Sequence, residues 1–132
     1  MKLDNAVVLV TGANRGLGLA FAREALARGA SKVYAAARQP AAVTLPGVVP
    51  LQLDVTDPDS VAAAAALASD VTLLINNAGI AEFGGFLGND AVASARRHFE
   101  TNVLGPLLLT RAFAPVLALS LIHISEPTRP LY

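Results

Sequence analysis

The chain reads Thr11-Gly12-Ala13-Asn14-Arg15-Gly16-Leu17-Gly18 after a short apolar stretch, residues 6–10, and before a helix-like segment. The apolar stretch is rich in valine, which is typical of a buried parallel strand. Gly12 allows a tight turn, and Gly16 allows a ligand to approach the backbone because no Cβ intervenes. A helix beginning near Gly16 offers free N–H groups and its positive end. The run therefore predicts a site for the pyrophosphate of a dinucleotide.

Three further motifs lie in order along the chain, and two of them directly follow predicted strands. They are Asp54-Val55-Thr56-Asp57, Asn76-Asn77-Ala78-Gly79 and Thr101-Asn102-Val103-Leu104-Gly105. The glycine run itself has the spacing Gly-x-x-x-Gly-x-Gly, which is only a moderate signal alone. With all four motifs in this order, the chain resembles the short-chain dehydrogenase/reductase family from about residue 3 to 116. The resemblance implies hydride transfer between a nicotinamide cofactor and a small-molecule carbonyl or alcohol.

Two helices are predicted in the first half of the chain. In the first, Gly18, Ala22, Ala25 and Gly29 share a face of small residues that can pack closely on a sheet. Gly29 is also a natural C-terminal stop. The second helix follows an N-cap and a first-turn proline, and spans residues 57 to about 68.

Strands are predicted at residues 32–37, about 48–53 and 71–75, with a loop or a shortened helix between 40 and 46. Alternating strands and helices imply right-handed crossovers. The fold class is therefore α/β: a Rossmann-like, doubly wound parallel sheet, truncated, with strand order 3-2-1-4 and its second half missing. The outer edge of the fourth strand is expected to have no neighbour.

Arg15 and Arg38 are predicted to choose the cofactor. A site for NAD carries an acidic residue about 20 positions after the glycine turn, and this chain has Ala37 and Arg38 there. Two guanidinium groups can bind a 2′-phosphate through charge-assisted hydrogen bonds. The predicted cofactor is NADP(H); in the alternative, the arginines are ordinary solvated charges.

The resemblance implies a set of cofactor-binding residues at the ends of the strands. They are Gly12, Asn14, Arg15, Gly16, Leu17, Gly18, Arg38, Asp54, Val55, Asn77, Ala78 and Gly79. Asp54 would accept from the adenine amino group, or alternatively cap the turn before the second helix. Asn77 would lie near the nicotinamide ribose, or tie loop backbone to neighbouring strands.

Asn102 matches a catalytic asparagine that the family uses beside Ser, Tyr and Lys in a proton relay. No Tyr-x-x-x-Lys occurs in the sequence, so the chain as it stands is expected to lack the proton donor. His98 and His123 show no triad or metal pattern. The segment Arg96-Arg97-His98 is expected to be the solvated face of a helix.

Composition narrows the classes of function. Of 132 residues, 54% are hydrophobic and 15% charged, which predicts a globular chain; ten basic and ten acidic residues cancel, which disfavours binding to nucleic acid. The absence of cysteine fits a reducing cytoplasm and excludes thiolate metal sites, and no signal-peptide pattern is evident. Residues 103–122 are interrupted by Pro106, Arg111 and Pro115, which favours a buried helix over a membrane span.

From Leu119 the sequence changes character and resembles a translated sequencing adapter. We expect residues 1–118 to form an NADP(H)-binding Rossmann half-domain and residues 119–132 to be a non-native tail of a truncated gene model. The complete parent could form homo-oligomers through the helices after the fourth strand. Two alternatives to an oxidoreductase stay open: a non-catalytic dinucleotide-binding module or inert fragment, and, less well supported, a methyltransferase with a related sheet.

Overall fold

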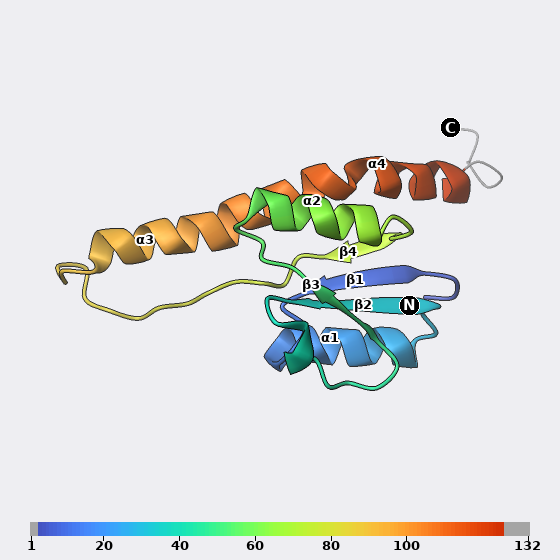
Figure 1. Ribbon diagram of the computed structural model, residues 1–132, viewed down its shortest axis with the longest axis horizontal. Helices are drawn as coiled ribbons and strands as arrows, with labels where there is room; N and C mark the ends of the chain where they lie inside the picture. The colour runs from blue at the N-terminus through green and yellow to red at the C-terminus, as the bar shows by residue number, and fades with distance from the viewer. Residues whose placement is uncertain (1–2, 126–132) are drawn as a thin grey trace.

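The computed structural model describes residues 3–125 and the side chains up to residue 119. Four parallel strands form one sheet in the order β3-β2-β1-β4, as the sequence predicts (Figure 1). They are β1 (Val7–Thr11), β2 (Lys32–Ala37), β3 (Val49–Gln52) and β4 (Leu73–Ile75). Because β3 and β4 form the two edges, β1 and β2 are the central strands, and nothing in the described chain pairs with the outer edge of β4.

Helices cover both faces of the sheet. Alternate residues of β1 point to opposite sides, so β1 contributes apolar side chains to a separate cluster on each face. Val8 and Val10 pack in the apolar cluster under α1 (Gly16–Ala27). Leu9 packs in the cluster under α2 (Pro58–Leu67) and α4 (Gly105–Ser125). These buried strands read as continuous apolar runs for this reason.

The ends of the first two helices follow the sequence signals, with one correction. The Asp57 side chain caps α2 by accepting from the Asp59 N–H at 3.0 Å, with Pro58 in the first turn. Gly18, Ala22 and Ala25 form the buried face of α1. Gly29, expected on that face, is exposed, because α1 ends at Ala27 and Gly29 turns the chain with φ +90°.

The second half of the described chain is one long helical rod that extends beyond the sheet (Figure 1). It comprises α3 (Ala91–Phe99), a π-helical turn η2 (Glu100–Leu104) and α4. A short 3₁₀ helix, η1 (Pro40–Ala42), lies in the segment 40–46, for which the sequence predicts either a loop or a shortened helix.

The expectation of a buried helix at residues 103–122 is wrong for most of its described surface. Only the face of α4 that meets the sheet and α2 is buried, at Gly105, Leu109 and Phe113. Within the described residues, Ala91–Leu119 is long and apolar enough to cross a membrane, with mean hydropathy 1.5 and 17% of that window buried. This is weak evidence of a span, since core helices of soluble proteins meet the same criterion. The predicted boundary at residue 118 falls inside α4, and residues 126–132 of the predicted tail lie outside the described range.

Candidate functional site

A cleft of about 660 Å³ opens at the carboxyl ends of the strands, where parallel α/β sheets bind ligands. It brings together segments that are far apart in the sequence. The predicted site residues that line it are Gly12, Asn14, Arg15, Gly16, Arg38, Asp54, Val55, Asn77, Ala78 and Gly79. Leu17, Gly18 and Asn102 do not line it, and each has a different role.

The glycine loop forms a cradle of bare backbone. Gly12 and Gly16 have φ values of +64° and +59°, which side chains rarely adopt. A Cβ at Gly16 would meet no atom within 4 Å, so it would project into open space at the cleft. Among the described residues, no side chain caps the first turn of α1, and this turn contains no acidic residue. The helix start therefore offers its N–H groups and positive end to an anion, and the loop fits a pyrophosphate.

Gly18 serves packing within the loop. A Cβ there would lie 2.1 Å from the Gly12 carbonyl oxygen and 2.5 Å from Asn77 Nδ2. Only glycine therefore lets α1 begin this close to the end of β1. Leu17 is 63% exposed and does not line the cleft.

Thr11 joins the glycine loop to the asparagine motif. Its buried Oγ1 accepts from the N–H groups of Asn77 and Ala78, both at 2.9 Å. In return, Asn77 Nδ2 donates to the carbonyl oxygens of Thr11 and Gly12 at 3.2 and 3.4 Å. Asn77 thus ties loop backbone together while also lining the cleft. Sequence reasoning missed Thr11 as a site residue, although its place between the strand and the first glycine was a usable signal.

Charged groups gather at the ends of β2 and β3. Arg15 and Arg38 are exposed, line the cleft and form no ion pair with the described side chains of residues 3–119. Asp54 Oδ1 accepts from the Thr56 hydroxyl at 2.7 Å and the Thr56 N–H at 2.9 Å. These bonds, with a smaller contribution from Arg38, lower the pKa of the Asp54 carboxyl. One oxygen of Asp54 therefore caps the turn, and the carboxylate still borders the cleft.

Asn102 lies in η2 and holds the loop after β4. Its Oδ1 accepts from the Ile80 N–H at 2.8 Å and its Nδ2 donates to the Ile80 carbonyl at 2.9 Å. These two contacts make Asn102 a scaffold for the loop, and its catalytic role stays a prediction.

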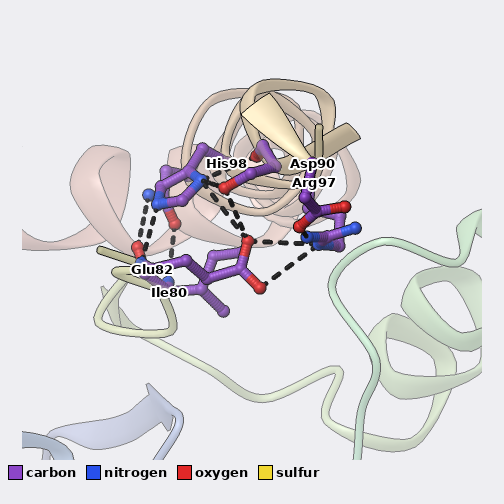
Figure 2. Close-up of polar contacts among 7 residues, drawn as sticks. Ile80, Glu82, Asp90, Arg97 and His98 are labelled. Atoms are coloured by element: carbon purple, nitrogen blue, oxygen red, sulfur yellow. Dashed lines mark hydrogen bonds and ion pairs between the residues drawn. The ribbon is translucent and has the colours of Figure 1, made fainter. Parts of the chain in front are cut away.

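A polar cluster that the sequence did not predict joins the loop after β4 to α3 (Figure 2). Arg97 contacts Glu82 at 3.1 Å and Asp90 at 2.6 Å, and His98 accepts from the Glu82 N–H at 3.0 Å. Arg96 and Arg97 are exposed, as expected of a solvated helix face, whereas His98 is half-buried because the loop folds back onto it. Glu82 and Arg97 also line the cleft.

A family model described as short chain dehydrogenase matches residues 6–121, a range that contains all four motifs. The chain belongs to the short chain dehydrogenase family. This confirms the family that the motifs predicted, and the parallel sheet with its 3-2-1-4 order is the fold expected of it.

Solved structures of the short chain dehydrogenase family superpose well on this chain. One from Burkholderia cenocepacia J2315, in complex with NADP, is 42% identical with a TM-score of 0.84, covering 91% of this chain and 52% of that one. An NADPH-bound carbonyl reductase from chicken fatty liver is 39% identical with a TM-score of 0.75, covering 87% and 49%. Galactitol 2-dehydrogenase from Agrobacterium fabrum is 33% identical over 126 residues, covering 89% of this chain. The chain spans about half the length of these relatives.

Proposed function

We propose that this chain is the cofactor-binding half of an NADP(H)-dependent oxidoreductase that acts on a small-molecule carbonyl or alcohol. The observation that carries the proposal is the bare-backbone cradle at Gly12 and Gly16, together with the exposed guanidinium groups of Arg15 and Arg38 in the same cleft. NADPH would supply the hydride from its nicotinamide ring. The pyrophosphate would bind to the N–H groups at the start of α1.

Selectivity for the phosphorylated cofactor would come from Arg15 and Arg38. No carboxylate occupies the end of β2, where one would repel a 2′-phosphate, and Arg38 stands there instead. Each charge-assisted hydrogen bond contributes about 1.5–3 kcal/mol, which is about tenfold or more in affinity. The solved relatives with NADP and NADPH bound support this choice of cofactor.

Titration of the chain with NADPH and NADH, followed by cofactor fluorescence, tests the proposal. We expect NADPH to bind at least tenfold more tightly than NADH, and Arg38→Ala to reduce that preference. The exposed helix residue Arg23, which does not line the cleft, provides the matched control in Arg23→Ala. Absence of binding to either cofactor would refute the proposal.

A second candidate is a dinucleotide-binding module without catalysis. It is favoured by the absence of Tyr-x-x-x-Lys from the sequence, and Tyr34 is engaged elsewhere, donating to Asp70 at 2.7 Å. Turnover with a panel of carbonyl compounds separates the candidates, because cofactor binding without turnover selects the module. Four further points stay predictions. They are that residues 1–118 form the cofactor-binding unit, that the tail is non-native, that the protein is cytoplasmic, and that the complete parent is a homo-oligomer.

A further inference from the structure

The loop between β4 and α3, residues 80–90, is held in place by polar contacts. Its large apolar side chains Phe83, Phe86 and Leu87 are each more than 90% exposed, so burial contributes little to its position. Asn102 binds both backbone groups of Ile80. The second anchor lies two residues further, at Glu82.

His98 provides that anchor through its neutral ring (Figure 2). His98 Nδ1 lies 2.7 Å from the Ser94 carbonyl oxygen, which can only accept, so Nδ1 carries the proton. Nε2 is then an acceptor, and it receives the Glu82 N–H at 3.0 Å. A protonated ring could not accept this bond.

The Glu82 side chain is fixed by the same helix. Its Oε1 accepts from Ser94 Oγ at 2.9 Å, and both carboxylate oxygens accept from Arg97 Nε at 3.1 and 3.2 Å. These bonds lower the pKa of the Glu82 carboxyl, and the bond from Ser94 has the largest effect. Asp90 in turn holds Arg97 at 2.6 Å. One loop residue is therefore bound to α3 through its main chain and its side chain together.

Glu82 lines the cleft on the side of Asn77 and Gly79, at the end of β4. Arg38 and Asp54 lie across the sheet, after β2 and β3. We propose that His98 and Glu82 form a latch that holds the loop 80–90 on α3 and fixes the cleft wall beside Asn77. The proposal rests on the proposed function, with the nicotinamide ribose beside Asn77 as the family resemblance implies. His98 is a positioning residue, because it acts through Glu82.

Two probes of different reach test the latch by calorimetry on the full chain. NADPH would fill the whole cleft, whereas adenosine 2′,5′-bisphosphate would fill only the side of Arg15 and Arg38. His98→Leu removes both ring nitrogens at similar volume, and His98→Gln keeps an acceptor for the Glu82 N–H. Arg96→Gln is the control, since the Arg96 side chain is exposed and forms no hydrogen bond or ion pair with the described side chains of residues 3–119.

We expect His98→Leu to weaken NADPH binding roughly two- to tenfold, the worth of one net hydrogen bond, and to leave the bisphosphate unchanged. His98→Gln should recover much of the loss, and Arg96→Gln should change neither affinity. Hydrogen exchange gives a readout without cofactor: the Glu82 amide should exchange faster in His98→Leu than in the parent chain.

Equal loss of both ligands, or an unchanged Glu82 amide in His98→Leu, would overturn the latch. Retained NADPH affinity in that variant would overturn it too. If the parent chain binds both probes, such a result refutes the latch alone. If the parent chain binds neither probe, the proposed function fails, and the assignment of the latch to a cofactor site fails with it.

Discussion

Replacing Gly18 by alanine tests how tightly the glycine loop is packed. The new Cβ would lie 2.1 Å from the Gly12 carbonyl oxygen and 2.5 Å from Asn77 Nδ2. The first atom is backbone, and the second is held by hydrogen bonds to Thr11 and Gly12. Alanine gains about 1 kcal/mol of helix propensity. Overpacking costs about 1–3 kcal/mol, and contact with backbone places this site at the upper end. We expect a net loss of about 2 kcal/mol in the free energy of unfolding.

Alanine substitutions at two other glycines distinguish an effect on packing from an effect on cofactor binding. Gly16→Ala meets no atom within 4 Å, so only its φ of +59° is costly, at about 1 kcal/mol. Its methyl group would nevertheless occupy the space proposed for the pyrophosphate. Gly47→Ala is the matched control, with φ +88° and an ordinary contact of 3.5 Å to Leu26, away from the cleft.

Urea unfolding and NADPH titration of the three variants form the assay. Gly18→Ala should lose both stability and binding. Gly16→Ala and Gly47→Ala should lose similar, smaller amounts of stability, while only Gly16→Ala loses at least tenfold in NADPH affinity. A Gly18→Ala chain as stable as the parent would refute the packing argument. Equal affinity in Gly16→Ala and Gly47→Ala would refute the cradle.

Three further substitutions each remove one hydrogen-bonding side-chain group. Thr11→Val leaves two backbone N–H groups without their acceptor and should lower the free energy of unfolding by about 2–3 kcal/mol, whereas Thr11→Ser should nearly restore it in urea unfolding. Asp57→Ala removes the cap of α2 and should cost about 1 kcal/mol; an unchanged thermal midpoint would contradict this. Tyr34→Phe removes the hydroxyl that donates to Asp70 and should cost about 1 kcal/mol at neutral pH. Lys32 first, and then Tyr34, lower the pKa of Asp70 in the folded chain, so the stabilisation is present above the ordinary value of 3.8 and is lost as pH falls through the lowered value. The parent and Tyr34→Phe should therefore converge in acid, and an equal difference at pH 7 and pH 2 would count against the argument.

The sequence predicted the sheet well because its signals are local. Val8, Leu9 and Val10 are all buried, on alternate faces of the sheet, which produces the apolar run that marks a central strand. The pair Asp57-Pro58 marks the start of α2. Burial of α4 was overestimated for a physical reason. Hydropathy shows which side chains of a helix are apolar, whereas the burial of these side chains depends on which other elements pack against the helix.

The site was predictable where residues follow strand ends and unpredictable where loops fold back. Asp54 and Asn77 converge on the cleft because parallel strands end at one edge. The bond between His98 and Glu82 joins residues 16 positions apart with no periodic pattern between them. Gly18 was recognised by its motif, but its contact with the Gly12 carbonyl needed coordinates.

The π-helical turn at Glu100–Leu104 changes the angular phase of the long rod. A π turn accommodates one residue more than an α turn, and one residue corresponds to about 100° of rotation around the axis. The stretch before the turn presents His98 to the loop, and the stretch after it presents Leu109 and Phe113 to the sheet. Removing a single residue from the turn would rotate these two surfaces against each other, so the loop and the sheet could no longer both be engaged by the same rod.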